Sequence, residues 1–264
     1  MNKFAEKLVV YTALFGAYDR LNPPPKEANN CDFICFSDVE QEVDGWVTVV
    51  VDAKNMDPVA LNRQYKLLPH KFLERYDASL YIDSNVKIIR DPYPLAQRYL
   101  EQALMACPRH FERACIYDEI KACATLGKIS VDEANTLTER YIKESFPKQI
   151  GLTENHILLR WHNEPAVIET MESWWCEFNN GLRRDQLSLM FVAWKNDFPI
   201  LFMSESARNN NAYFRYTLHK ADASRSFLKA IAAEVRASKD RNFLYKGTSS
   251  AIDMIKRLKQ RLGC

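Results

Sequence analysis

The 264-residue sequence lacks several features that would place it in a specialised class of protein. No stretch approaches the roughly 18 consecutive apolar residues that a membrane-spanning helix requires. Glycine is scarce, with 7 residues, and the sequence contains neither an internal repeat nor a low-complexity segment. The charge is nearly balanced, with 36 Lys and Arg against 34 Asp and Glu. This balance argues against a strongly basic nucleic-acid-binding protein, so we expect no nucleic-acid partner.

Cysteine is present, but not in a pattern that predicts disulfides or a zinc site. The 7 cysteines are odd in number and scattered, and Cys31 and Cys35 have no second pair to complete a zinc site. Glu6 and Lys7 lie where a signal peptide would be apolar. These features predict a cytoplasmic protein with reduced thiols. With 47% apolar and 27% charged residues, the chain can build a sizeable core.

Short apolar runs alternate with helical segments along the first half of the chain, which is typical of an α/β sheet. The runs cover residues 8–15, 32–37, 46–51 and 78–82 and resemble buried parallel strands. Further strands are expected at residues 156–161 and 200–203. Helices are expected to begin at Asp57-Pro58 and after Ser130, which forms a capping-box pattern with Glu133. Two more helices are expected at residues 165–178 and 185–194.

The chain changes character after residue 220. Residues 221–264 contain ten Lys and Arg against four Asp and Glu, and their apolar positions recur every three or four residues. We therefore divide the chain into an α/β domain, residues 1–220, and a basic, helical C-terminal extension, residues 221–264. Such a helix could pack on the body. It could also bring the protein to the inner face of an anionic membrane as a peripheral contact.

The segment that is most informative about function is residues 80–86. An apolar strand ends at Asp83, a small polar residue follows, and Asn85 comes next. Because side chains alternate along an extended chain, Asp83 and Asn85 can point to one side at the carboxyl end of the strand, where ligands bind in open α/β sheets. Carboxylate and carbonyl oxygens suit Mg²⁺ or Mn²⁺. An ordinary strand end with an Asx turn is the alternative.

A cationic helix face precedes this strand. Lys66 follows Asn62 by four residues and Arg63 by three, which places it beside both on one side of the helix. Next to a carboxylate that binds a divalent ion, such a face would neutralise a diphosphate. A solvated helix face is the alternative interpretation.

Polar residues also follow the first two strands. Thr12, Tyr18 and Asp19 form a polar and aromatic set that could hold a nucleoside base and its ribose. Asp38, at the end of the second strand, could accept hydrogen bonds from a base or a ribose. Together with Asp83, these residues predict a nucleotide site at one edge of the sheet.

Taken in order, VVYTALFGAYDRL, CDFICFSD, ALNRQYK and LYIDSNVKI are similar to segments of GT-A-type nucleotide-sugar glycosyltransferases. The sequence most resembles the glycosyltransferase-like domain family also found in plant mucilage-related proteins, and the likeness continues through HFERACIYDEI, ILLRWHN and RRDQLS. The resemblance covers residues 8–220. It implies a GT-A-like, Rossmann-like fold with a mixed, mostly parallel sheet flanked by helices. It also implies transfer of a sugar from a nucleotide sugar, with UDP-sugars favoured, to a glycan or a lipid-linked acceptor.

The resemblance also implies how the donor would be held. Asp83, Ser84 and Asn85 would form a DxD-like motif for Mn²⁺ or Mg²⁺, although Asn85 replaces the second acid and makes a weaker ligand. His219 would be a late histidine ligand of the same metal, and Lys220 would reach the leaving diphosphate. A structural role is the alternative for His219.

Acceptor activation requires a carboxylate or a histidine within hydrogen-bond reach of a hydroxyl. By resemblance, Asp185 and Gln186 lie where related enzymes hold the sugar or activate the acceptor. Asp185 is the preferred catalytic candidate, and Glu119 and His110 follow it. An inverting enzyme needs such a base and a retaining one does not, and both outcomes stay open.

Two other functions compete with glycosyl transfer. Asn85 could mark a non-catalytic nucleotide- or glycan-binding module that has kept a decayed GT-A site. A strand that ends in an aspartate is also typical of phosphatases with an aspartate nucleophile. That class needs a second acid two residues further on, where Asn85 is a poor proton donor and acceptor.

Overall fold

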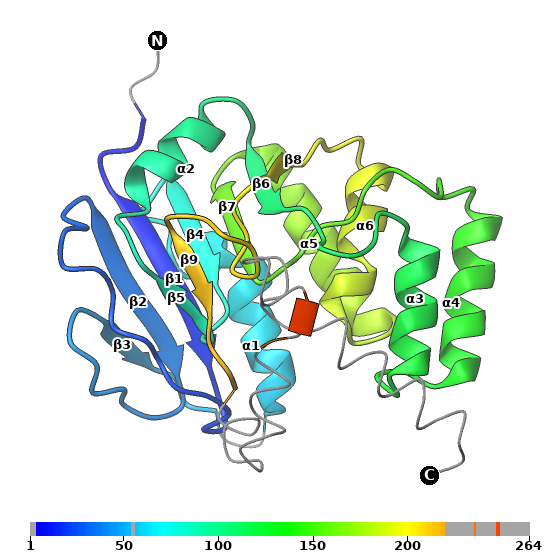
Figure 1. Cartoon of the computed structure of the whole chain (residues 1–264), viewed down its shortest axis with the longest axis horizontal. Helices are drawn as coiled ribbons and strands as arrows, with labels where there is room; N and C mark the ends of the chain where they lie inside the picture. Colours follow the sequence, from blue (N-terminus) through cyan, green and yellow to red (C-terminus); the bar gives the residue numbers. More distant parts are fainter. Residues whose placement is uncertain (1–3, 54–55, 220–234, 236–246, 249–264) are drawn as a thin grey trace.

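The computed structural model describes residues 4–53, 56–219, 235 and 247–248, and it is built around a seven-stranded sheet (Figure 1). The sheet order is β3-β2-β1-β4-β7-β6-β8, and β5 pairs separately with β9. The strands are β1 (Leu8–Leu14), β2 (Cys31–Ser37), β3 (Val47–Val50), β4 (Ala78–Ile82), β5 (Val86–Ile88), β6 (Met105–Pro108), β7 (Ile157–Trp161), β8 (Leu201–Met203) and β9 (Phe214–Tyr216). The helices are α1 (Pro58–Leu67), α2 (Tyr93–Leu100), α3 (Ile116–Thr125), α4 (Val131–Lys143), α5 (Pro165–Asn180) and α6 (Leu189–Lys195), with 3₁₀ turns η1 (Pro69–Lys71) and η2 (Asp185–Leu187).

All strands of the large sheet except β7 point the same way. β7 is antiparallel to its neighbours β4 and β6, whereas β1 is parallel to β2 and β4, β2 is parallel to β3, and β6 is parallel to β8. The carboxyl ends of β1, β2, β3, β4, β6 and β8 therefore meet at one edge of the sheet. In open α/β sheets this is the edge at which ligands bind.

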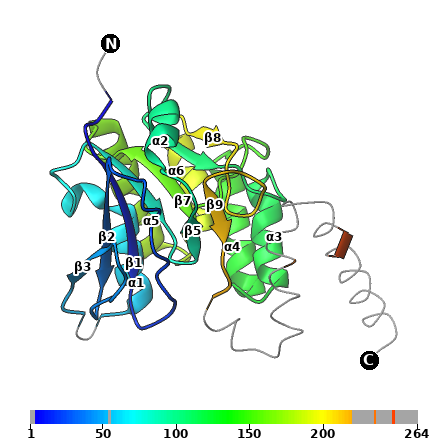
Figure 2. The ribbon, with the colours of Figure 1, turned by 60° about the vertical axis from the view of Figure 1, so that its left-hand side comes forward.

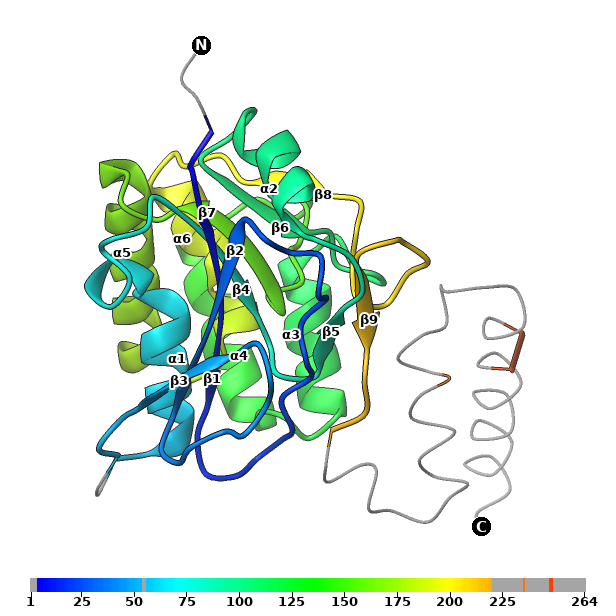
Figure 3. The same ribbon diagram turned by 90° about the vertical axis from the view of Figure 1, so that its left-hand side faces the viewer.

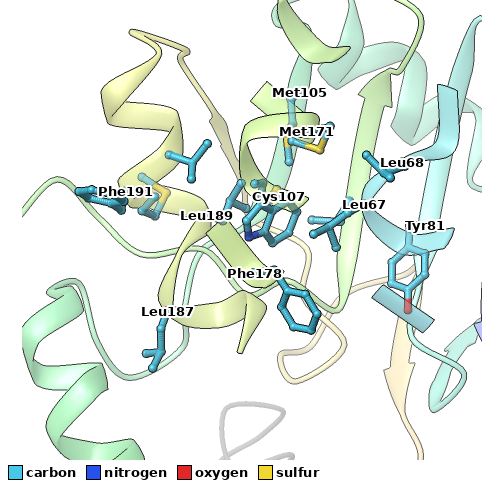
Figure 4. Packing of buried hydrophobic residues seen from close by; sticks show 14 of the residues in the cluster. Leu67, Leu68, Tyr81, Met105, Cys107, Met171, Phe178, Leu187, Leu189 and Phe191 are labelled. Atoms are coloured by element: carbon cyan, nitrogen blue, oxygen red, sulfur yellow. The ribbon is translucent and has the colours of Figure 1, made fainter. Parts of the chain in front are cut away.

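The two faces of the sheet are covered by different layers. Because side chains alternate along a strand, Val9 and Tyr11 face the cluster formed with α1, α3, α4, α5 and α6, whereas Leu8 and Val10 face α2, β5 and β9. Figure 3 shows α1 and α5 on one side of the sheet and β5 and β9 on the other. In Figure 4, labelled side chains of α1, β6, α5 and α6 point toward one another in the first layer. Two packed layers thus hold the sheet edge in place.

The expected elements and the observed ones agree for most of the chain. The expected strands correspond to β1, β2, β3, β4, β7 and β8, and the expected helices include α1, α4 and α5. The expectation of a buried third strand was wrong, because β3 is the edge strand and Val47, Val49 and Val50 are exposed. The single helix expected at residues 185–194 was also wrong: Ser188, with φ −121°, separates η2 from α6.

The basic C-terminal extension, residues 221–264, falls almost wholly outside the described residues. The same is true of Lys220. Figure 2 places β3 at one side of the described part and the α3–α4 hairpin at the other. Within that part, no helix combines the length and the apolarity needed to cross a membrane.

The capping box at the start of α4 gives a direct test of the local fold. The Ser130 hydroxyl accepts a hydrogen bond from the Glu133 backbone N–H at 3.1 Å, and the Glu133 carboxylate accepts one from the Ser130 N–H at 2.7 Å. Ser130→Ala is expected to lower the free energy of unfolding by about 1 kcal/mol, measured by urea titration. Thr136→Ala, on an exposed turn of the same helix, is the control and should change it by less than about 0.5 kcal/mol. Equal effects of the two variants would contradict the capping role.

Candidate functional site at the carboxyl edge of the sheet

A pocket of about 440 Å³ opens at the carboxyl ends of β1 and β4, beside the first two turns of α1. Its position is the one that strand direction predicts for a ligand. The pocket is lined by Ala13, Leu14, Phe15, Gly16, Tyr18, Pro58, Val59, Asn62, Arg63, Tyr81, Asp83, Ser84 and His219. Several residues singled out from the sequence therefore line one cavity, although they come from four separate segments of the chain.

The turn after β1 brings the backbone close to the start of α1. Gly16 has a φ of +70°, and a Cβ atom at this position would lie 3.4 Å from the ring of Pro58. Its N–H donates a hydrogen bond to Asp38 Oδ2 at 2.8 Å, which ties the ends of β1 and β2 together. The other Asp38 oxygen is buried and has no hydrogen-bond partner among the described residues. Asp38 therefore holds the turn at Gly16 in place without lining the pocket itself. Tyr18 lines the pocket and is 61% exposed.

A cluster of two cations and two carboxylates lies beside the pocket. Lys66 Nζ is 2.8 Å from Asp185 Oδ2 and 3.4 Å from Asp83 Oδ1, and Arg63 Nε is 3.2 Å from Asp185 Oδ1. Lys66 is only 1% exposed, whereas the Asp83 side chain is 36% exposed. The expectation of an open cationic face that includes Lys66 was therefore wrong. Lys66 lies behind Asp83, where two carboxylates neutralise it, and Arg63 is the cation that lines the pocket.

The cluster keeps both carboxyl groups ionised. Burial raises the pKa of Asp83, but the positive charges of Lys66 and Arg63 outweigh burial, so this pKa lies below its usual value. Burial likewise raises the pKa of Asp185, and Arg63 and Lys66 together bring it well below the usual range. Tyr81 donates a hydrogen bond to Asp83 Oδ1 at 2.9 Å, and burial raises the pKa of its phenol, which stays protonated. A low pKa makes Asp185 a weak proton acceptor.

The lowered pKa of Asp185 makes stability depend on pH. A carboxyl group with a lower pKa in the folded chain than in the unfolded chain stabilises the fold above the unfolded-state pKa, and this contribution disappears as the pH falls toward the folded-state pKa. The melting temperature of Asp185→Asn should therefore lie clearly below that of the wild type at pH 7 and approach it as the pH falls from about 5 to 3. Asp197→Asn, at an exposed carboxylate, is the matched control. A difference that stays constant with pH would contradict the charge cluster.

His219, which follows β9, also lines the pocket. His219 Nδ1 is 2.6 Å from Asp19 Oδ2, and Asn85 Nδ2 is 3.1 Å from His219 Nε2. Asp19 thus fixes the tautomer with hydrogen on Nδ1, which leaves the Nε2 lone pair as an acceptor. Asn85 itself is 4% exposed and does not line the pocket, so the expectation that Asp83 and Asn85 point into it together was wrong.

These donors fit a divalent cation only in part. Asp83 Oδ2 has no hydrogen-bond partner among the described residues, and His219 is oriented by a carboxylate in the way that is common for metal-binding histidines. The described residues contain no group of three His, Cys, Asp or Glu side chains that could hold a metal by themselves. Asp83 therefore suits an ion whose other ligands are phosphate oxygens and water, as Mg²⁺ usually requires, and His219 could join it only by exchanging the hydrogen bond that its Nε2 accepts from Asn85.

Other predicted site residues lie away from the pocket. Thr12 is 0% exposed within β1, so it cannot contact a ligand in the pocket, and that expectation was wrong. Gln186 donates a hydrogen bond to Thr153 O at 2.6 Å and accepts one from the Asn155 N–H at 3.4 Å. Its amide thus holds the loop before β7, and it does not line the pocket.

His110 and Glu119 form a separate buried cluster with Arg113. His110 Nε2 is 3.5 Å from Glu119 Oε2, and Arg113 Nε pairs with the same oxygen. His110 Nδ1 accepts hydrogen bonds from the backbone N–H groups of Glu112 and Arg113, and burial lowers the pKa of its imidazole. These contacts bind the turn after β6 to α3. Neither residue lines the pocket that contains Asp83.

Sequence reasoning missed the contribution of Tyr81 and Asn22. Tyr81 lines the pocket and bonds Asp83, with Lys66 Nζ 5.0 Å from the centre of its ring. Asn22 Nδ2 donates hydrogen bonds to Ser84 O at 3.1 Å and to Thr217 Oγ1 at 3.4 Å, which joins the turn after β4 to the segment that carries His219. Strand alternation could have identified Tyr81, because Tyr81 and Asp83 lie two residues apart.

The chain is similar to a known protein family and to a curated plant protein. The model of a family described as the TOD1/MUCI70 glycosyltransferase-like domain matches residues 1–215. Probable hexosyltransferase MUCI70 of Arabidopsis thaliana is 26% identical over 251 residues, which cover 83% of this chain and 43% of the plant protein. The chain thus spans less than half the length of this curated relative.

A solved glycosyltransferase structure shares the fold. The apo structure of the WbbM bifunctional glycosyltransferase superimposes with a TM-score of 0.52 at 13% identity, over 91% of this chain and 45% of that one. The structure of the galactosyltransferase LgtC with donor and acceptor sugar analogs gives 0.47 at 10% identity, over 91% and 99%. The mixed, mostly parallel sheet with flanking helices is the GT-A-type fold expected from the sequence. The chain belongs to the TOD1/MUCI70 glycosyltransferase-like domain family.

Proposed function

We propose that this domain transfers a hexose from a nucleotide sugar, with a UDP-sugar as the favoured donor, to a glycan acceptor. The observation that carries the proposal is the pocket in which Asp83, Arg63 and the first turns of α1 lie together at the carboxyl edge of the sheet. Family membership and the name of the plant relative, a probable hexosyltransferase, support the same activity.

The donor diphosphate would lie between Arg63 and Asp83. At the start of α1, Pro58 has no N–H and the Val59 N–H donates to the Asp57 carboxylate, so Arg63 and not the helix start would supply the positive charge for the anion. Asp83 would hold Mn²⁺ or Mg²⁺, with His219 as a further ligand once its Nε2 exchanges the hydrogen bond from Asn85 for the metal, and the ion would neutralise the diphosphate oxygens. As negative charge grows on the departing diphosphate, Arg63, kept charged by its carboxylate neighbours, stabilises it without having to reorganise.

The remaining pocket residues would hold the nucleoside and the sugar. Tyr18 offers an exposed ring for the base, and the turn braced by Asp38 places backbone groups beside the ribose. Ser84 lies next to Asp83 and faces the same cavity. Asp185 would act by keeping Arg63 and Lys66 in place. Because its pKa is low, it suits this role better than that of a general base.

The test measures binding and turnover on the same samples. With UDP and Mn²⁺ at about 100 times the dissociation constant, a ligand that binds only the folded chain adds about 2.7 kcal/mol of stability and raises the melting temperature by several degrees. In a panel of nucleotide sugars, we expect slow hydrolysis of one UDP-hexose with Mn²⁺ and little without it. Stabilisation without turnover of any donor would favour a binding module. A phosphorylated Asp83 seen by mass spectrometry would indicate a phosphatase.

A further inference from the structure

A buried arginine without an acidic partner lies close to the Asp83 cluster. Arg160 is on β7, the strand between β4 and β6, and it is 0% exposed. Its guanidinium donates hydrogen bonds to the Tyr11 hydroxyl, to the Lys66 carbonyl oxygen at 2.9 Å and to the Met171 sulfur at 3.2 Å. None of these acceptors carries a charge. Within the part of the chain that the structure describes, no carboxylate pairs with the guanidinium and its Nε has no hydrogen-bond partner.

Stability alone does not explain a guanidinium at this position. A buried charge that lacks an opposite charge costs free energy, whereas an apolar side chain of similar size packs without that cost. The partial negative charge at the carboxyl end of α1, where Lys66 lies, compensates the guanidinium only in part. The groups that Arg160 holds therefore indicate its role better than its effect on stability does.

Arg160 and Tyr11 together fix the carboxyl end of α1. The Lys66 carbonyl accepts a second hydrogen bond, at 3.0 Å, from the Tyr11 hydroxyl, which itself accepts one from Arg160. Because the last carbonyls of a helix have no partner within the helix, these two donors satisfy one of them and join α1 to β1 and β7. The Lys66 backbone is thereby held where its ammonium group meets Asp83 and Asp185.

Tyr11 also supports the second group that holds Asp83. The rings of Tyr11 and Tyr81 pack edge to face with their centres 5.3 Å apart, and the Tyr81 hydroxyl donates a hydrogen bond to Asp83 Oδ1 at 2.9 Å. Lys66 Nζ lies 3.4 Å from the same oxygen. Both groups thus converge on Oδ1, while Asp83 Oδ2 has no hydrogen-bond partner among the described residues.

We propose that Arg160 is a positioning residue for Asp83. It holds the backbone of Lys66 directly and the ring of Tyr81 through Tyr11, and these two groups fix one carboxylate oxygen and leave the other to a divalent cation. The inference rests on the proposed function. Arg160 does not line the pocket, so it acts only through the side chains that it holds. Replacing a group that orients a metal ligand typically weakens metal binding by about 10- to 100-fold.

The test measures manganese affinity in the presence of UDP. Mn²⁺ is titrated into the full chain with UDP, and the electron paramagnetic resonance signal of unbound Mn²⁺ gives the dissociation constant. Arg160→Met, which is apolar and unbranched, should raise this constant about tenfold. Arg160→Lys should raise it less, because it keeps the charge and one nitrogen donor. Tyr11→Phe keeps the ring against Tyr81 but loses the hydroxyl, and it should raise the constant at least about twofold even if Arg160→Met does not fold.

Leu159→Ala is the matched control, because Leu159 is equally buried in β7 but faces the opposite layer. It should lower the melting temperature and leave the manganese constant unchanged, which separates a loss of stability from a loss of position. The proposal is overturned if Arg160→Met and Tyr11→Phe keep the wild-type constant, or if Leu159→Ala raises it equally.

A crystal structure of Arg160→Met, or of Tyr11→Phe if only that variant folds, separates the two proposals. The distance between Lys66 Nζ and Asp83 Oδ1 should exceed about 4 Å, the limit of an ion pair, whether or not a metal is bound. If the wild type binds no Mn²⁺ with UDP, the proposed donor site fails, and this distance still decides the positioning role. Lys66 and Asp83 side chains that stay in place in the variant would overturn that role.

Discussion

Asp83→Asn is expected to lower the rate of donor hydrolysis and sugar transfer on the order of 10³-fold. The substitution keeps the size of the side chain and removes its charge. Asp83 is the carboxylate that is exposed to the pocket while being paired with Lys66, so under the proposed function its loss would weaken metal binding and leave the donor diphosphate without its anchor. The melting-temperature shift with UDP and Mn²⁺ should disappear as well. Initial rates and thermal shifts on purified protein provide the measurement.

Asp197→Asn is the control for this prediction. Asp197 is exposed and has a φ of +48°, a conformation that asparagine tolerates, and its carboxylate lies outside the pocket. Its variant should retain the wild-type rate and the wild-type shift. Retention of more than about one tenth of the rate in Asp83→Asn would contradict the role given to Asp83.

Lys66→Met should produce the largest loss of stability. Removing one partner of a buried ion pair leaves an uncompensated buried charge, which costs about 3–5 kcal/mol. Here the loss of one ammonium deprives both Asp83 and Asp185 of a partner. We expect the free energy of unfolding, measured by urea titration, to fall by that amount, with the midpoint shifted and the slope unchanged.

A double-mutant cycle isolates the interaction between Lys66 and Asp185. If Lys66 serves mainly to neutralise Asp185, then Lys66→Met combined with Asp185→Asn should be less destabilised than the sum of the single variants, by at least about 1 kcal/mol. Additive effects would mean that the two side chains do not interact. In the double variant Arg63 still has Asp83 as a neighbouring opposite charge, so the site keeps one positive and one negative side chain.

The position of the site was largely predictable because it depends on local patterns. An apolar run that stops at an aspartate marks the end of β4, and Asp57-Pro58 marks the start of α1, with the Asp57 carboxylate accepting a hydrogen bond from the Val59 N–H at 3.1 Å. Strand direction then places Asp83 beside Gly16 at one edge. None of these steps requires knowledge of tertiary contacts.

The pairing of side chains was not predictable, because the partners are far apart in sequence. Helical spacing groups Lys66 with Asn62 and Arg63, but only the tertiary fold, in which α1 packs against β1 and α5, buries Lys66 between Asp83 and Asp185. Thr12 was assigned to the pocket from its chemical type, and the packing of both sheet faces buries it completely.

Long-range contacts also account for the elements that the sequence did not reveal. β5 and β9 have three residues each, too few for periodicity to detect, and they exist because Val86 pairs with Tyr216 far along the chain. That pairing carries His219 to Asp19, 200 residues away. The chemical types of His110 and Glu119 suit proton transfer and make both candidate bases, yet in the fold both side chains fix the turn after β6.

The most direct measurement is the anomalous scattering of manganese in crystals of the protein grown with UDP and Mn²⁺. Our account predicts one manganese peak within coordination distance of the Asp83 carboxylate, with the diphosphate of UDP between that metal and the start of α1. A manganese ion or a uridine diphosphate bound elsewhere, with the pocket between β1 and β4 filled only by water, would contradict it.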